Sequence, residues 1–574
     1  MPAFKNQTAS SLLLPLLMSL MAPSIQAALP NGVSAGDVTD QSVVLWARST
    51  SKGSLRFEWS ESADFATSAN TQTAVESGRV PVKTTVTGLK PATRYYYRAV
   101  DASGQAAVGQ FRTLGDPHAA SGLHFGTGLH FGVSGDIRQE LAPYTGIRNA
   151  DTANLDFFVC LGDCMYAENY SVEGTPTAKT LAQYRARYQS TLTGKLGLNT
   201  WKDLRASTAQ FALIDDHEVI NDFAGGAGKG SDIRFDNTGN YINETRRFKT
   251  GLQAFSEYTP IADLTWHSTS DGRDSNKLKL YRSRRFGKMA MMSLIDARTF
   301  RDQGLKPVTD LGPSGVGAFL AQSFDPSRTF LGKTQLASLK TDLKAAQEDG
   351  ITWKFVMIPE PIQNLGVVGA EDRYEGYAAE RTELLKFITS EGIRNVVFVT
   401  ADIHGTLVNN LTYEEIPMGP KIQTGAFEIS TGPMAFDQPF GPTVAALGAG
   451  FGLLTAEQAA FYDSLPINND TDDAPNDKDD FIKQLVNGLI TQLGYDPVGL
   501  AGSGIDARLI QGDYLATHTY GWSEFEIDAA SQTLRITTYG VPAYNATRLK
   551  ADSQSVVKQH PKIVSQFEVR PNSQ

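Results

Sequence analysis

One stretch, residues 157–166, restricts the possible folds more than any other part of the chain. Residues 157–161 form an apolar run with the length of a strand buried inside a parallel sheet. Gly162 then lets the backbone turn, and Asp163 and Tyr166 follow at the carboxyl end of the strand. Open α/β sheets hold ligands at this edge and hard cations prefer oxygen ligands, so the stretch predicts a metal site. The alternative is that Asp163 caps the next helix and Tyr166 is a half-buried aromatic residue.

Three further apolar runs end in side chains of the same kind. Residues 129–136 end in Gly-Asp, and a helix predicted at 144–150 leads from there to the strand at 157. This β-α-β order indicates a parallel pair of strands. Residues 210–218 end in Asp-Asp-His-Glu, and residues 395–404 end in Asp-Ile-His. Each ending alone also fits a helix start, where acidic side chains interact favourably with the helix dipole.

Four strand ends with ligand-type side chains together predict a cluster of two metal ions. Such a cluster clamps a phosphoryl group, activates a water and stabilises the leaving oxygen. Asp163 lies on the central strand and is the candidate to bridge both ions. His217 is the candidate donor near the leaving group, and Arg138 or Arg298 could neutralise phosphate charge bidentately. The predicted metal ligands are Asp136, Asp163, Tyr166, Asp216, Asp402 and His404.

The length and charge of the chain narrow its possible functions. At 574 residues it is too long for a single core, so two or more domains are expected. It carries 52 Lys and Arg against 62 Asp and Glu, a formal net charge of −10, with no basic cluster. This balance disfavours nucleic-acid binding and suits a protein that holds multivalent cations.

The first residues have the composition of a secretory signal. Lys5 precedes an apolar run at 12–21 that is too short to span a bilayer, and small residues surround a predicted cleavage site after Ala27. We expect a signal peptide at 1–27, with no twin-arginine pair. No later stretch is apolar enough for a membrane helix, so we expect a periplasmic or secreted protein without a transmembrane anchor.

The two cysteines of the chain, Cys160 and Cys164, flank Asp163. An oxidising compartment permits a disulfide between them. However, Cys160 lies on the predicted strand and the spacing is local, so we predict two free thiols, with Cys164 the more exposed.

Residues 30–114 alternate short β-type runs with turns, which predicts a β-sandwich. Residues 42–48, 55–59 and 94–100 are expected strands, and residues 88–97 resemble the entry to the penultimate strand of a fibronectin type III domain. This part offers no catalytic constellation, and we interpret it as a packing or spacer module.

The remaining chain, residues 128–560, is predicted to form the catalytic domain. Its apolar spacing predicts helices at 180–192, 334–347 and 379–391, strands at 286–295, 353–359 and 426–430, and a terminal hairpin at 521–539. The fold of 432–518 is not evident from its pattern. An acidic run at 468–480 lacks the spacing of an EF-hand, and we interpret it as a solvated loop, with weak calcium binding as the alternative.

The order of these motifs resembles the PhoD-like alkaline phosphatases of the calcineurin-like and purple acid phosphatase superfamily. Besides the strand ends, residues 33–48 and 296–301 (Asp-Ala-Arg-Thr-Phe-Arg) are similar to family motifs. The resemblance implies an α/β fold: a four-layer metallophosphoesterase β-sandwich core flanked by helices, with an N-terminal fibronectin type III-like β-sandwich. It also implies hydrolysis of phosphomonoesters and phosphodiesters.

The resemblance further implies a cluster of Fe3+ with Ca2+, in which Asp163 bridges. Tyr166 and His404 would bind the ferric ion, and Asp216 and Asp402 the second metal. The chain departs from the family at residues 134–136, where Ser-Gly-Asp replaces a common Ser-Cys-Gln. Asp136 is closer to the purple acid phosphatase pattern, so Zn2+ or Mn2+ stay open.

Two other functions are compatible with the sequence. One is a phosphodiesterase of the phospholipase D type on lipid or nucleotide substrates. The other is an inactive phosphatase fold that serves as a binding protein. The complete set of ligand residues argues against the second, because a binding module has no need for every ligand. The substrates we expect are small phosphoesters, and the oligomeric state is not encoded in any visible pattern.

Overall fold

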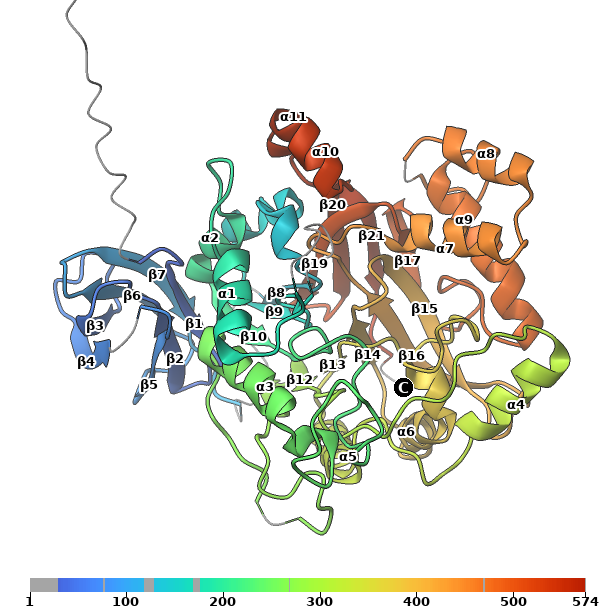
Figure 1. Ribbon diagram of the computed structural model, residues 1–574, viewed down its shortest axis with the longest axis horizontal. Helices are drawn as coiled ribbons and strands as arrows, with labels where there is room; N and C mark the ends of the chain where they lie inside the picture. Colours follow the sequence, from blue (N-terminus) through green and yellow to red (C-terminus); the bar gives the residue numbers. More distant parts are fainter. Residues whose placement is uncertain are drawn as a thin grey trace, which may run out of the picture.

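The computed structural model describes residues 29–75, 78–117, 128–168, 176–267, 269–467 and 470–572. The predicted signal peptide, residues 1–27, lies outside the described residues. Within them, two large sheets pack face to face and helices cover their outer faces (Figure 1). This arrangement confirms the predicted α/β fold class.

The larger sheet has ten strands and contains three of the four strands that are followed by predicted ligand residues. Its central strands β8, β9, β10 and β1 are parallel, and β19 pairs with β8 antiparallel. In spatial order the strands are β17 (Ala507–Gly512), β21 (Lys562–Val569), β20 (Leu534–Pro542), β19 (Thr519–Asp528), β8 (Gly128–Ser134), β9 (Phe157–Cys160), β10 (Ala209–Ala212), β1 (Val33–Gly36), β2 (Ser42–Ala47) and β5 (Val82–Thr87).

The second sheet has seven strands and contains β14, the fourth strand that is followed by predicted ligand residues. Strands β12, β13, β14 and β16 run parallel. The spatial order is β11 (Arg282–Phe286), β12 (Ala290–Leu294), β13 (Trp353–Met357), β14 (Val396–Thr400), β16 (Ile422–Ser430), β15 (Thr406–Tyr413) and β18 (Leu515–Ala516).

Helices complete the outer layers. The first group packs on the ten-stranded sheet: α1 (Leu181–Thr191), α2 (Thr200–Ser207), α3 (Arg246–Tyr258), α10 (Ala546–Ala551) and α11 (Ser553–Val557). The second group covers the seven-stranded sheet: α5 (Lys333–Glu348) and α6 (Ala378–Ser390). Four helices lie beyond these, α4 (Pro313–Ser323), α7 (Phe440–Gly450), α8 (Ala456–Ser464) and α9 (Lys478–Ile490).

Stacked phenylalanines join the two sheets. Phe131 of β8 stacks between Phe157 and Phe525 of its own sheet, each with a ring-centroid separation of 4.9 Å. It also meets Phe355 of the opposite sheet edge-on at 5.2 Å. Alternate residues of these strands point the other way, so Phe158 packs under the helices instead. The strands are therefore apolar on both faces, as parallel strands between two layers must be.

The N-terminal β region shares one of its two sheets with the rest of the chain. Its sheet β4-β3-β6-β7 is self-contained, with β3 (Gly53–Ser60), β4 (Ala69–Val75), β6 (Arg94–Asp101) and β7 (Ala106–Arg112). Its other strands, β1, β2 and β5, extend the ten-stranded sheet, because Gly36 of β1 pairs in parallel with Gln210 of β10. The hydrogen-bonded sheet thus crosses the boundary between the predicted regions 30–114 and 128–560.

Most predicted elements occur within a few residues of their predicted bounds, but two predictions are wrong. The helix predicted at 144–150 is replaced by the short 3-10 turns η2 (Thr145–Ile147) and η3 (Ala150–Thr152), with Tyr144 in a left-handed conformation that no helix continues. The solvated loop predicted at 468–480 ends early, because Asp477 caps α9 and residues 477, 479 and 480 are buried. Residues 468 and 469 lie outside the described part.

No helix in the described part of the chain combines the length and the apolar character that crossing a membrane requires.

Replacing Phe131 should destabilise the protein strongly. Phe131→Ala removes a fully buried ring from the junction of the two sheets, which costs about 3–5 kcal/mol for a buried phenylalanine. We expect a clear fall in the urea concentration at half unfolding. The matched control is Val108→Ala, whose side chain is 56% exposed, with an expected change within about 0.5 kcal/mol. Equal shifts for the two variants would contradict the role of the aromatic stack.

Candidate metal centre

The predicted ligand residues follow directly after the ends of four parallel strands. Asp136 follows β8, Asp163 follows β9, Asp216 follows β10, and Asp402 and His404 follow β14. Gly135 and Ala401 lie so close that a Cβ on Gly135 would be 3.3 Å from that of Ala401, so the edges of the two sheets meet here. The packing of the sheets therefore brings all four corners to one place.

Several of these residues have a strained backbone. The φ angles are 58° at Asp136, 51° at Asp163, 65° at Asp402 and 60° at His404, all in the left-handed region. Residues other than glycine visit this region rarely, and such strain clusters at functional sites. Gly162, at φ 106°, cannot be replaced without a clash, because a Cβ there would lie 2.6 Å from that of Asp215.

Glu218, the last residue of the Asp-Asp-His-Glu motif, holds two of the corners together. Its carboxylate accepts backbone hydrogen bonds from Cys164 at 2.7 Å, Asp215 at 2.9 Å and Asp163 at 3.3 Å. It is fully buried. The sequence pattern indicates no role for Glu218, and the structure shows that it fixes the loop that presents Asp163.

One part of the site gathers Asp136, Tyr166 and His404. His404 Nε2 lies 3.5 Å from Asp136 Oδ1. Phe436 stacks on the imidazole of His404 with ring centroids 3.4 Å apart, and on its other side approaches Tyr166 at 5.6 Å. Phe436 was not identified from the sequence, because it lies in the region 432–518 whose pattern was uninformative.

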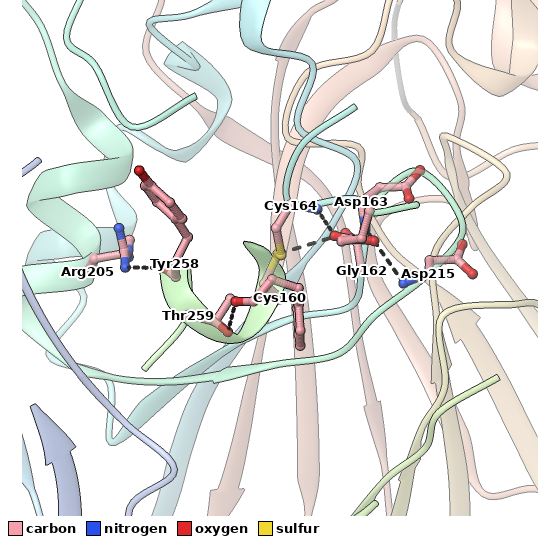
Figure 2. Close-up of a disulfide and its surroundings, with 10 residues drawn as sticks. Cys160, Gly162, Asp163, Cys164, Arg205, Asp215, Tyr258 and Thr259 are labelled. Carbon is pink, nitrogen blue, oxygen red and sulfur yellow. Dashed lines mark hydrogen bonds between the residues drawn. A yellow bond between two sulfur atoms is a disulfide. The ribbon is translucent and has the colours of Figure 1, made fainter. Parts of the chain in front are cut away.

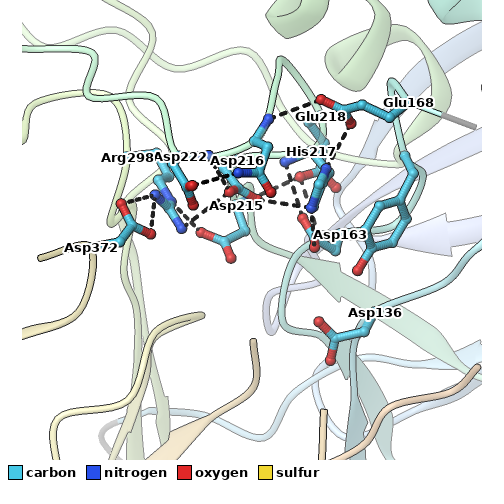
Figure 3. Close-up of polar contacts among 12 residues, drawn as sticks. Asp136, Asp163, Glu168, Asp215, Asp216, His217, Glu218, Asp222, Arg298 and Asp372 are labelled. Carbon is cyan, nitrogen blue, oxygen red and sulfur yellow. Dashed lines mark hydrogen bonds and ion pairs between the residues drawn. The ribbon is translucent and has the colours of Figure 1, made fainter. Parts of the chain in front are cut away.

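The adjoining part contains Asp163, Asp216 and His217, whose ligand atoms lie within 4.8 Å of one another (Figure 3). His217 Nε2 is 4.0 Å from Asp163 Oδ2 and 3.9 Å from Asp216 Oδ1. The other ring nitrogen, Nδ1, is 2.7 Å from Glu168 Oε2. Glu168 was missed by sequence analysis, and it directs Nε2 toward the two aspartates.

Asp402 comes from the second sheet and lies beside Asp215 and Glu360. Asp215, Glu360 and Asp402 each have a carboxylate oxygen within 4.8 Å of the other two. The same holds for Asp216, Asp222 and Asp372. Glu360 and Asp372 belong to loops that gave no sequence pattern. The site thus contains more carboxylates than the four strand ends alone predicted.

The donor set fits bound cations. Asp136 Oδ2, Asp216 Oδ1 and the Tyr166 hydroxyl are buried and have no hydrogen-bond partner among the described residues. A buried polar atom without a partner costs free energy, so such atoms occur where an ion or a functional group completes them. Carboxylate, phenol and imidazole are all metal ligands, and the carboxylates favour hard cations.

Burial and mutual repulsion shift the pKa values of the carboxyl groups. Burial raises the pKa of Asp136, Asp163 and Asp402 well above the usual range, and neighbouring carboxylates add to the effect. Burial also raises the pKa of Asp215, to about 6, although Arg298 opposes the rise. Asp216 differs, because Arg298 and His217 outweigh its burial and lower its pKa.

The two histidines have opposite pKa shifts. For His217, burial lowers the pKa, but Asp216 and Glu168 outweigh it and raise the value to about 9. For His404, burial and the nearby His217 lower the pKa to about 3. His217 is therefore set to carry a proton at neutral pH, whereas His404 is neutral, the form that coordinates metals.

The two predicted phosphate-binding arginines are engaged by carboxylates. Arg298 is fully buried and pairs with Asp215 at 2.6 Å, Asp372 at 2.8 Å, Asp216 at 3.5 Å and also Glu360. Arg138 donates from Nε to Glu140 at 2.8 Å and lies 3.8 Å from Asp437. Contact of either arginine with phosphate remains a prediction.

The prediction of two free thiols is wrong. The structure joins Cys160 and Cys164 in a disulfide, with Cα atoms 6.8 Å apart (Figure 2). The left-handed turn at Gly162 and Asp163 brings Cys164 back to the end of β9, which local spacing along the sequence did not reveal. Asp163 therefore lies inside a small covalent loop, which limits how far it can move.

Metal binding should change the pH dependence of stability. Without metal, these carboxyl groups have a higher pKa in the folded protein than in the unfolded chain, where the pKa is 3.8. Their contribution to stability is therefore complete below pH 3.8 and is lost as the pH rises through the folded pKa values. For Asp215 the folded value is about 6, a loss of roughly 3 kcal/mol. Thermal unfolding between pH 4 and pH 7 should show chelator-treated protein falling progressively below metal-loaded protein. A constant gap would contradict this.

Comparison with known proteins supports a family assignment. The family model described as PhoD-like phosphatase matches residues 131–473, and the model of the PhoD-like phosphatase N-terminal domain matches residues 17–115. Alkaline phosphatase D of Bacillus subtilis (strain 168) is 27% identical over 422 residues, covering 66% of this chain and 65% of that protein. The match thus spans slightly less than two thirds of the relative's length.

The fold itself matches a solved structure described as PhoD. The TM-score is 0.66 with 19% identity, over 96% of this chain and 94% of the other. At this identity the match shows a shared fold. Because the phosphatase model covers more than half of the chain, the protein belongs to the PhoD-like phosphatase family.

Proposed function

We propose that the protein is a metal-dependent hydrolase of phosphomonoesters and phosphodiesters. The observation that carries this is the convergence of four strand ends on neighbouring groups of carboxylates, most of them buried and some with unpartnered oxygen atoms. Family membership and the name of the relative, alkaline phosphatase D, support the same chemistry. No nucleic-acid partner is implied by the acidic composition.

Two cations would be held by the residues predicted from the sequence. Asp136, Tyr166 and His404 would hold one, Asp216 and Asp402 the other, and Asp163 would bridge. Bound cations would polarise phosphoryl oxygens and make a water nucleophilic near neutral pH. Fe3+ with Ca2+ is the pair that the resemblance to PhoD-like phosphatases implies, with Zn2+ or Mn2+ as the alternative.

His217 would supply the proton for the leaving oxygen. Glu168 holds Nδ1, so Nε2 faces the space beside Asp163 and Asp216. A proton at Nε2 can pass to an alkoxide as the ester bond breaks. Arg298 would act as a positioning residue, because its ion pairs fix the carboxylates that surround it.

A cavity beside the centre favours action on diesters as well. Phe436 stacks on His404, and the next residue, Asp437, lines a cavity of about 370 Å³. Tyr462, Lys478 and His518 also line it. The second ester group of a diester, including a lipid or nucleotide, could occupy this space. A phosphodiesterase of the phospholipase D type is therefore the second candidate.

We also propose export to the periplasm or the medium. The support is the signal-like composition of residues 1–27 and the disulfide between Cys160 and Cys164, which persists in an oxidising compartment.

The central experiment compares a mono-aryl and a bis-aryl phosphate as substrates of the purified protein, with and without a chelator. We expect chelation to stop hydrolysis, and Asp163→Asn to lower kcat by at least about 100-fold, since even outer-shell changes cost 10–100-fold. The matched control is Asp506→Asn, which replaces an exposed carboxylate outside the predicted ligand set.

The ratio of the two rates distinguishes a phosphatase from a phosphodiesterase. Hydrolysis of neither ester, with iron, calcium, zinc and manganese each supplied, would refute the proposal and favour the binding-protein alternative.

Replacing His217 should slow hydrolysis to an extent that depends on the leaving group of the substrate. With His217→Gln we expect kcat to fall by about 100-fold or more on an alkyl phosphate, whose alkoxide needs a proton. On p-nitrophenyl phosphate the fall should be much smaller, because p-nitrophenolate leaves without one. His560→Gln, at an exposed position, is the control. Equal losses on both esters would show that His217 acts in binding and not as the proton donor.

A further inference from the structure

A second group of acidic residues lies outside the metal centre, at the start of α9 (Figure 1). One carboxylate oxygen each of Asp470, Asp472 and Asp480 lies within 4.8 Å of the others. Asp470 and Asp472 precede the helix, and Asp480 is in its first turn. None of the three is a ligand candidate of the catalytic centre. Acidic groups at helix starts are common, so proximity alone decides nothing.

Asp480 distinguishes this group from an ordinary solvated cluster. Asp480 is only 3% exposed, and its Oδ2 atom has no hydrogen-bond partner among the described residues. A buried carboxylate without a partner is costly unless a cation or a proton completes it. Asp480 offers an oxygen within 4.8 Å of Asp470 and Asp472, and also one within 4.8 Å of Asp473 and Asp513. Lys483 already pairs with Asp473 and Asp513, so a bound cation would be shared with Asp470 and Asp472.

The nearby basic residues are used elsewhere. Lys483 Nζ lies 2.5 Å from Asp473 and 2.8 Å from Asp513. Lys478 Nζ donates to the backbone carbonyls of Tyr462 and Asp463. In the described residues no Lys or Arg forms an ion pair with Asp470, Asp472 or Asp480. Lys483 acts on Asp480 only at a distance, by lowering its pKa, and its ion pairs are with Asp473 and Asp513.

We propose that Asp470, Asp472 and Asp480 form a Ca2+ site that is separate from the catalytic centre. The donors are all carboxylate oxygens, which suit hard cations. Asp470 and Asp472 come from the irregular chain before α9 and Asp480 from its first turn, and Ca2+ accepts such varied ligand geometry more readily than Mg2+ does. Burial and the carboxylates of Asp477, Asp513 and Asp470 raise the pKa of Asp480 to about 7, consistent with excess negative charge.

The site is connected to the cavity beside the catalytic centre. Asp479, the neighbour of Asp480, accepts hydrogen bonds from Thr517 N and His518 Nδ1, both at 2.8 Å. His518 Nε2 in turn lies 2.7 Å from the Tyr462 hydroxyl, and both side chains line the cavity. A cation that fixes the start of α9 would therefore also fix one wall of the cavity.

Calcium binding can be counted in the full chain. We would measure bound Ca2+ by equilibrium dialysis in Asp163→Asn protein, where the catalytic cluster is impaired, and add Asp472→Asn or Asp480→Asn. Each second substitution should remove one bound Ca2+ per chain. It should also abolish the part of the rise in Tm that Ca2+ causes and Mg2+ does not. The matched control is Asp463→Asn, exposed on α8.

In the otherwise wild-type chain, Asp472→Asn should keep activity on an aryl phosphate, which separates this site from the catalytic one. Asp472 is exposed, so its replacement tests the site even where Asp480→Asn folds poorly. Unchanged Ca2+ stoichiometry in both variants would overturn the proposal. So would an Asp480→Asn protein that is more stable regardless of Ca2+, because a proton on Asp480 would then satisfy the buried oxygen.

Discussion

Mutual repulsion among buried carboxylates is the constraint on which the rest of this structure depends. Asp136 and Asp163 are almost fully withdrawn from water, and Asp402 partly so, at one edge of two sheets where charge is costly. Arg298 offsets part of that cost from the centre of the network, through ion pairs with Asp215 and three other carboxylates. Cations would offset the remainder, so the fold and the proposed chemistry share one electrostatic requirement.

The arrangement also needs rigid supports, because like charges move apart unless the backbone holds them. The left-handed corners of Asp136 and Asp163 are strained and persist only where surrounding contacts determine them. Glu218 provides such contacts through three backbone amides, and the disulfide closes the loop around Asp163. Beneath them, Phe131 and its neighbours join the two sheets whose edges carry the candidate ligands.

The N-terminal region supports the site indirectly. Because β1 pairs with β10, the strand that delivers Asp216 is flanked on both sides and is not an edge strand. An edge strand would expose unpaired backbone groups and move more easily. The β region therefore stabilises the catalytic sheet, in addition to the packing role that its sequence suggested.

Local patterns of the sequence were sufficient to predict the strand ends and which side chains follow them. An apolar run followed by Gly-Asp or Asp-x-His specifies a buried strand and the side chain at its end, because both depend on neighbours a few residues away. Tertiary structure alone decided the disulfide, the partners of Arg138 and Arg298, the sheet shared with β1, and the addition of Glu168, Glu360 and Asp372. These depend on which segments distant in sequence the packing of two sheets brings together, and no local periodicity records that.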